Sequence, residues 1–393
     1  MTAPRLEIDL DKIDHNARTL VGWLGGRGIS VTGVTKATLG SPAIARALLR
    51  AGVRGLGDSR IENIESMRRA GVPARMALIR SPMRSQVDRV VEHADVSFNT
   101  ELEVIRGLAS AGRAAGRTHA VVLMVELGDL REGIMPGDLA DVVRETLRMP
   151  SIVLAGIGTN LACQSGASPG AANMAELSAL AASIESRFGV TVDVVSGGNS
   201  GNLDWALSGA ATGRINDLRL GESILLGCEP LHRRPLDGLH ADAFTLVAEV
   251  IESKVKPAQP WGDIAQTAFG DLAAPAPPEA GSGGDRRRED RSLGHRSREG
   301  RSRTIVALGR QDVDPEGLVP TTPGVEVLGA SSDHLIVTAG GNGLAVGAEV
   351  AFRLDYSALV RAMTSPFVAK VVKRGHVPPS SCASTRGTVV PGA

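Results

Sequence analysis

Lysine is scarce in this sequence, and one lysine ends a run of residues typical of a buried strand. Only six of the 43 basic residues are lysines, and Lys36 closes the run ISVTGVTK. A lysine amine can lose its proton and attack a carbonyl group to form a Schiff base, whereas an arginine side chain stays protonated. Lys36 is therefore a candidate for covalent chemistry with a carbonyl compound.

A glycine-rich segment further along the chain is suited to binding an anion. Residues 196–202 read SGGNSGN. Gly197 and Gly198 allow a ligand to approach the backbone closely, and Ser200 offers a hydroxyl donor. A phosphate site together with a reactive lysine suggests a phosphorylated carbonyl cofactor that is held as a Schiff base.

Both features fall within a stretch of alternating strands and helices. Between residues 11 and 225, short β-branched runs alternate with segments of helical period, the first of which Asp11 is expected to cap. Eight such strands predict a (β/α)8 barrel, because the alternative, a doubly wound sheet, usually has fewer strands. The candidate strands cover residues 31–36, 54–57, 76–80, 94–98, 119–126, 152–158, 191–195 and 215–219.

The chemistry of such a barrel is carried by residues at the carboxyl ends of its strands, and phosphate commonly binds after the seventh and eighth. This rule selects groups that follow five of the predicted strands, without reference to any family. They are Lys36; Glu126, Asp129 and Arg131; Thr159 and Asn160; the run 196–202; and Arg219, Gly221 and Glu222.

Beyond residue 235 the pattern changes to strands without long helices. Segments near 242–256, 304–309, 325–328, 334–338 and 349–355 alternate as strands do. We therefore predict a barrel over residues 1–235 and a smaller, mostly-β domain over 236–373. Within that domain, residues 270–303 have the composition of a disordered insertion, and residues 374–393 that of a flexible tail.

The overall composition argues against several functional classes. The 43 basic and 43 acidic residues give a net charge of zero, so no nucleic-acid partner is expected. No apolar stretch reaches the roughly 20 residues needed to cross a bilayer, and the first residues lack the order of a signal peptide. The three cysteines have no metal-type spacing, so no metal site is expected. We therefore expect a cytoplasmic protein without membrane contact.

Motifs along the chain resemble the alanine racemase-like family of pyridoxal-phosphate enzymes. They include RLEIDLDKIDHNAR, VTKA around Lys36, ELGDLREG, GTN, NS and LRLGE, in that order. The motifs SGGNSGNL, NDLRLGESILLG, ALGRQD and GASSDHL are most similar to the alanine/ornithine racemase branch. The resemblance covers roughly residues 5–260 and 304–369. It implies a cofactor-binding barrel followed by a β domain that completes the active site.

The resemblance also implies roles for individual residues. Lys36 matches the lysine that binds pyridoxal 5'-phosphate covalently and serves as one of two proton carriers. Arg219 matches the arginine that hydrogen-bonds the pyridine nitrogen, which it leaves unprotonated because a guanidinium does not give up its proton. Arg131 matches an arginine that helps to bind the substrate carboxylate. The other implied cofactor-binding residues are Asn160, Gly198, Asn199, Ser200, Gly221 and Glu222.

The sequence departs from the family at the second proton carrier. Alanine racemases use a tyrosine in a Gly-Tyr-x-Asp setting of the partner subunit, but Arg310 takes its place in the matching run, residues 309–312. Arginine is a poor base, so the candidates are His334, Asp312 and Tyr356, the only tyrosine of the chain. His334 is slightly favoured, because histidine ordinarily titrates near neutral pH.

The resemblance implies an amino acid racemase that acts on ornithine, lysine or alanine and assembles as a homodimer. Arg131 and Asp333 are expected to bind the substrate, and acidic Glu126, Asp129 and Asp333 would suit a cationic side chain. Two alternatives stay open. One is a non-catalytic pyridoxal-phosphate-binding protein, which usually consists of the barrel alone. The other is a D-amino acid aldolase or dehydratase, which would normally need a metal pair near the site.

Overall fold

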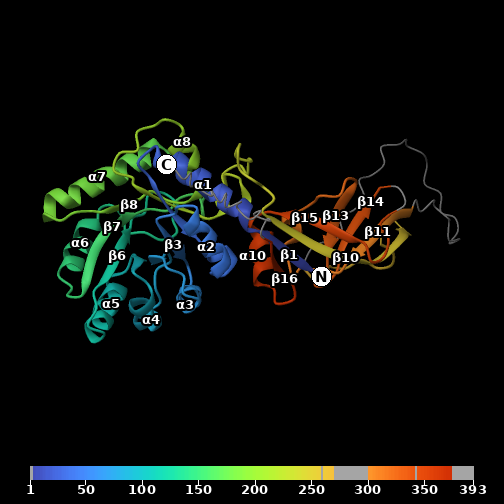
Figure 1. Cartoon of the computed structure of the whole chain (residues 1–393), viewed down its shortest axis with the longest axis horizontal. Helices are drawn as coiled ribbons and strands as arrows, with labels where there is room; N and C mark the ends of the chain where they lie inside the picture. The colour runs from blue at the N-terminus through green and yellow to red at the C-terminus, as the bar shows by residue number, and fades with distance from the viewer. Residues whose placement is uncertain (1–2, 258–259, 270–299, 341–342, 374–393) are drawn as a thin grey trace, which may run out of the picture.

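The computed structural model describes residues 3–257, 260–269, 300–340 and 343–373. A parallel barrel lies on the left of Figure 1 and a second, mostly antiparallel sheet on the right. The predicted tail and residues 270–299 of the predicted insertion lie outside the described residues, whereas residues 300–303 belong to strand β11 (Gly300–Val306). Among the described helices, none combines the length and apolar character that crossing a bilayer requires.

Eight parallel strands close into a barrel, which confirms the predicted fold class. Each strand pairs with the next along the chain, and the last pairs with the first, with Thr32 opposite Arg219 in the register. The barrel strands are β2 (Ser30–Val34), β3 (Gly55–Asp58), β4 (Met76–Leu78), β5 (Val96–Asn99), β6 (His119–Met124), β7 (Ile152–Gly158), β8 (Val194–Ser196) and β9 (Asp217–Leu220).

Helices surround the barrel because each has one apolar stripe that it buries against the strands. In α1 (Leu10–Gly25), for example, Ile13, Ala17 and Leu20 are fully buried. This helix begins two residues earlier than predicted, because the carboxylate of Asp9 accepts hydrogen bonds from the backbone N–H groups of Asp11 and Lys12. The other barrel helices are α2 (Pro42–Arg50), α3 (Ile61–Arg69), α4 (Val87–His93), α5 (Leu102–Ala114), α6 (Leu139–Leu147), α7 (Ala171–Phe188), α8 (Leu203–Leu207) and α9 (Glu222–Leu226).

The second sheet is built from the other strands of the chain. Its order is β12-β15-β10-β11-β14-β13, and β10 also pairs with β1, which in turn pairs with β16. Strand β1 (Arg5–Asp9) therefore belongs to this sheet although it precedes the barrel in the sequence. The remaining strands are β10 (Phe244–Pro257), β12 (Leu318–Pro320), β13 (Val325–Ala330), β14 (Leu335–Ala339), β15 (Glu349–Leu354) and β16 (Ala369–Lys373).

The helix α10 (Tyr356–Thr364) brings the second domain against the barrel (Figure 1). It packs on η1 (Lys36–Thr38), the single helical turn that follows β2. Asp355 caps α10 by accepting from the N–H of Ala358 at 2.9 Å, and its other oxygen pairs with Arg233 of the barrel at 3.0 Å. Residues near the carboxyl end of the barrel therefore face the start of α10.

Candidate active site

Lys36 was predicted to end the first barrel strand, and it lies just after the carboxyl end of β2, as the first residue of η1. Ala37 and Thr38, the next residues of η1, are buried, whereas the Lys36 side chain is exposed. Within the described part of the chain, its amine takes part in no hydrogen bond or ion pair. The preceding Thr35 is held by a 2.7 Å hydrogen bond from its hydroxyl to the buried carboxylate of Asp58. The fold thus fixes the backbone at Lys36 and leaves the amine available.

Arg219 is buried among acceptors at the carboxyl ends of neighbouring strands. Its side chain donates to Ser196 Oγ at 2.5 Å, to the carbonyl oxygen of Thr159 at 2.8 Å and to Asn160 Oδ1 at 3.3 Å. The guanidinium carbon lies 5.1 Å from the centre of the Phe98 ring. Burial lowers the pKa of Arg219 from its ordinary value. A cation held this rigidly is a well-positioned donor.

The predicted anion-binding run forms a tight loop that is tied to Asn160. Asn199 Nδ2 donates to Asn160 Oδ1 at 3.1 Å, so this amide oxygen accepts hydrogen bonds from both Asn199 and Arg219. Gly198 has a φ of 144°, and a Cβ there would lie 2.1 Å from Asn202 Oδ1. That oxygen accepts the N–H of Asn199 at 3.0 Å. Only glycine therefore fits at position 198 of this loop.

The predicted phosphate-binding residues lie next to two buried polar atoms that lack partners. Ser200 Oγ accepts the backbone N–H of Ser223 at 3.2 Å, which brings the loop after β8 to residues 221–223 after β9. The hydroxyl of Ser223 and Nδ2 of Asn160 are buried without a hydrogen-bond partner among the described residues. Unpaired buried polar atoms are costly, so a bound group with acceptor oxygens would satisfy them. These residues fit a phosphorylated cofactor.

Glu222, the first residue of α9, places a carboxylate beside the same loop. Burial raises the pKa of Glu222, while the charges of Arg233 and Lys36 act in the opposite direction. Tyr356, at the start of α10, has its pKa raised by burial and by the charge of Glu222. Tyr356 and Lys36 therefore lie at the same barrel mouth within one chain.

Arg131 also lies at the mouth, in the loop after β6. It pairs with the neighbouring Glu132, which raises the pKa of Arg131. Two of the three acidic residues that were expected to suit a cationic substrate already accept hydrogen bonds from the backbone. The fully buried carboxylate of Asp129 accepts the N–H groups of Gln164 and Ser165, and Glu126 accepts that of Gly128 at 2.6 Å.

Unlike Tyr356, the other three candidates in the β domain, Asp312, Asp333 and His334, form no hydrogen bond or ion pair with the barrel among the described residues. His334 and Asp333 lie in the turn between β13 and β14, where His334 Nδ1 is 2.9 Å from Asp333 Oδ1 and both side chains are exposed. Asp312 is buried, and its carboxylate accepts the hydroxyl of Ser365 at 2.9 Å and the N–H of Gly309 at 3.2 Å. Asp312 therefore ties a loop of the β domain to the end of α10.

Two residues of the site were not singled out from the sequence. Ser196 belongs to the predicted run, but its contact with Arg219 depends on the register of two strands. Cys163 is an exposed thiol that accepts a hydrogen bond from Asn199 Nδ2 at 3.3 Å and lies near the charges of Arg131 and Arg219. The only sequence signal for Cys163 was its position in the loop after the sixth barrel strand, which contains Asn160.

Comparison with known proteins identifies the family. The model of the alanine racemase N-terminal domain matches residues 8–230. A lysine racemase of Thermotoga maritima is 37% identical over 94% of this chain and 99% of its own length. An ornithine racemase of Acetoanaerobium sticklandii is 33% identical over 93% of this chain and 99% of its own length. The crystal structure of alanine racemase from D-cycloserine-producing Streptomyces lavendulae superimposes with a TM-score of 0.69 at 20% identity, covering 95% of this chain and 97% of that one. The chain therefore belongs to the alanine racemase family of amino acid racemases.

Proposed function

We propose that this amino acid racemase interconverts the L and D forms of a basic amino acid, lysine or ornithine, with pyridoxal 5'-phosphate as its cofactor. The observation that carries the proposal is the similarity to a lysine and an ornithine racemase over nearly the whole of all three chains. Alanine is the third candidate substrate that the family resemblance suggests.

The residues at the barrel mouth supply what the cofactor needs. Lys36 would hold it through its exposed amine, and Arg219 would donate to the ring nitrogen. Its phosphate would be held by Ser200 and the backbone around Gly198, Asn199, Gly221 and Glu222, with the unpaired hydroxyl of Ser223 nearby. Asn160, whose buried Nδ2 has no hydrogen-bond partner in the described part of the chain, would face the ring. When bound, the cofactor withdraws electrons from the substrate and makes the hydrogen on its α-carbon acidic.

Racemisation requires proton carriers on the two faces of the α-carbon. Lys36 would move the proton on one face, and Arg131 would hold the substrate carboxylate through its planar fork. For the other face we favour His334 from a second copy of the chain. Its ring is exposed and is oriented by Asp333. Asp312 is a weaker candidate because its carboxylate already accepts two internal hydrogen bonds. Tyr356 is weaker because it lies at the same mouth as Lys36 in the same chain.

A homodimer follows from this assignment. Because the turn that carries His334 and Asp333 forms no hydrogen bond or ion pair with its own barrel in the described residues, we infer that it would reach the site of a second copy. Mixing a Lys36→Ala chain with a His334→Gln chain tests this arrangement. Such a mixture should regain part of the activity that each variant lacks alone, since one of its two sites keeps both residues.

The function is tested by incubating the purified, cofactor-loaded protein with L-lysine, L-ornithine and L-alanine in deuterated water. We expect deuterium at the α-carbon and the D enantiomer from lysine or ornithine, but not from alanine. The opposite preference would refute the assignment of a basic substrate. Cofactor binding without exchange from any amino acid would favour a non-catalytic binding protein, and release of glycine from D-threonine would favour an aldolase.

The role of Lys36 is tested in the same preparation. Lys36→Ala should remove the visible absorbance band of the covalently bound cofactor and abolish exchange. Lys12→Ala is the matched control, since Lys12 pairs with Asp242 outside the barrel mouth. It should leave both the band and the exchange unchanged.

A further inference from the structure

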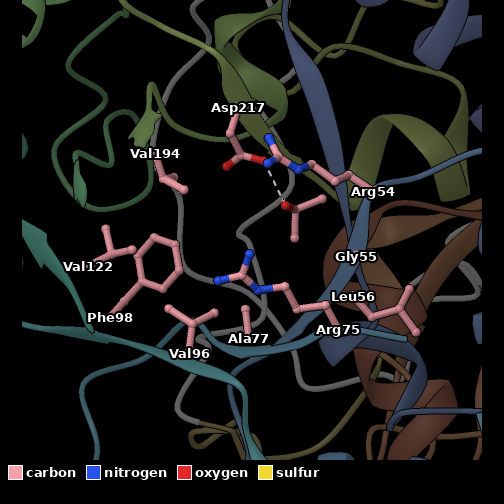
Figure 2. Close-up of a pocket in the computed structure, with 11 residues that line it drawn as sticks. Arg54, Gly55, Leu56, Arg75, Ala77, Val96, Phe98, Val122, Val194 and Asp217 are labelled. Carbon is pink, nitrogen blue, oxygen red and sulfur yellow. Dashed lines mark hydrogen bonds between the residues drawn. The ribbon is translucent and has the colours of Figure 1, made fainter. Parts of the chain in front are cut away.

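The barrel contains a cavity at the end opposite Lys36. It has a volume of about 60 Å³, and Figure 2 shows the side chains that line it. Gly55, Val96, Val194 and Asp217 of this lining are the first residues of their strands, so the cavity opens at the amino-terminal ends of the barrel. The cavity is therefore separate from the site at the carboxyl ends of the strands. Phe98 and the Arg219 side chain stacked on it lie between the two.

Two guanidinium groups converge on this cavity from neighbouring strands. Arg54 and Arg75 immediately precede β3 and β4, and both side chains extend toward the same space in Figure 2. The guanidinium of Arg75 makes no hydrogen bond to any residue that the structure describes, and only its backbone carbonyl accepts one, from the N–H of Leu56. The Arg54 guanidinium has one long contact of 3.5 Å to Ser30 Oγ, and neither arginine forms an ion pair with a described residue. The two guanidinium groups together offer ten N–H donors at one opening of the cavity, and almost none of these donors has an acceptor within the protein.

The one carboxylate in the lining is already engaged. Asp217 Oδ1 accepts the hydroxyl of Thr32 at 2.7 Å, and Oδ2 accepts that of Ser196 at 2.5 Å. Two positive charges therefore face a single negative charge that is hydrogen-bonded elsewhere. The rest of the wall is apolar, with Val96, Val122 and Phe98 facing the arginines (Figure 2).

We propose that this cavity binds a small aliphatic carboxylate. Its carboxylate group would lie between Arg54 and Arg75, because the guanidinium fork matches two carboxylate oxygens. Its hydrocarbon end would pack on the valines and Phe98. Because a buried water needs about 10–15 Å³, a cavity of this size has room for about four to six waters, which is the scale of a short-chain acid.

The test is calorimetric titration of the full-length, cofactor-loaded protein with sodium butyrate. We expect binding that Arg75→Ala and Arg54→Ala each weaken by tenfold or more, and Ala77→Leu, which fills the cavity, should also weaken it. Arg113→Ala is the matched control, because Arg113 is an exposed arginine at the end of α5, outside this lining. Arg131→Ala should leave butyrate binding unchanged, since Arg131 lies at the other end of the barrel.

Three outcomes would overturn the proposal. Butyrate could fail to bind, or its binding could be lost in Arg131→Ala and kept in Arg75→Ala, which would place it at the substrate site. Inorganic phosphate could bind as tightly as butyrate, which would show that the apolar wall contributes nothing. Racemase activity plays no part in the readout, so failure here is distinguishable from failure of the proposed function.

Discussion

Asp217 and Arg219 are joined through a single hydroxyl group. Ser196 Oγ accepts a hydrogen bond from Arg219 at 2.5 Å and donates its proton to Asp217 at 2.5 Å. Residues two apart on a strand point to the same face, so both charged side chains enter the barrel interior from β9. Asp217 thus compensates the buried cation without contacting it, and Arg219 keeps its remaining N–H groups for acceptors at the barrel mouth.

The two hydrogen bonds through Ser196 Oγ predict that Ser196→Ala lowers the catalytic rate without unfolding the protein. The change removes an acceptor from Arg219 and a donor from Asp217, a cost of about 1–3 kcal/mol, so kcat/KM should fall about tenfold to a hundredfold. Steady-state racemisation with the thermal midpoint measured in parallel checks this. Ser196→Thr, which keeps the hydroxyl, should recover most of the activity. Ser208→Ala is the control, because the hydroxyl of Ser208 bonds to Trp205 and Ala210, its neighbours in the sequence.

Asp312 and His334 should respond to substitution in opposite ways. Asp312→Ala removes the acceptor of Ser365 and Gly309, so the free energy of unfolding should fall by about 1–3 kcal/mol while kcat is kept. His334→Gln should leave unfolding unchanged and reduce α-carbon exchange about a hundredfold or more, the usual contribution of a proton carrier. Urea denaturation and deuterium exchange measured on both variants decide the matter. A loss of exchange confined to Asp312→Ala would assign the proton carrier to Asp312 instead.

Cys163 should be the thiol through which alkylating reagents inactivate the enzyme. It is exposed beside Asn199, whereas Cys228 is half-buried, and burial raises the pKa of Cys228 to about 11. In a Cys382→Ser background, N-ethylmaleimide should label Cys163 first and block activity in proportion, as followed by mass spectrometry. The added group would fill the mouth next to Arg131 and Arg219. Cys163→Ala should resist inactivation, and equal sensitivity of that variant would contradict the placement.

His119 should make the protein less stable in acid. It is buried at the start of β6 beside the hydroxyl of Ser97, and burial lowers the pKa of His119 to about 4. Below about pH 6.5, His119 therefore binds a proton in the unfolded chain but not in the folded chain. The free energy of unfolding consequently falls as the pH falls. Between pH 7.5 and pH 5 this group should cost about 2 kcal/mol. Denaturant titrations should show that His119→Gln loses that component, whereas exposed His232→Gln keeps it.

The barrel could be predicted because its signals are local. β-branched runs and helical periodicity located all eight strands, and the rule that chemistry sits at strand ends selected Lys36, Asn160 and Arg219 together. What the sequence could not show depends on contacts between distant segments. The burial of Asp129 under the loop at Gln164 is one example, and the pairing of Asp312 with Ser365 is another. From the sequence, both carboxylates looked available for chemistry. The groups that donate hydrogen bonds to them come into place only when the chain folds.

The position of β1 has a consequence for how the protein is made. This strand, Arg5–Asp9, is synthesised before the eight barrel strands, whereas its partners β10 and β16 follow them in the sequence. An unpaired strand edge invites pairing with other chains, and charged residues along it oppose that. Arg5, Glu7 and Asp9 alternate with Leu6 and Ile8. We therefore expect these three charges to oppose aggregation of the strand until its partners are made. In the folded protein, Arg5 pairs with Glu349 at 2.6 Å.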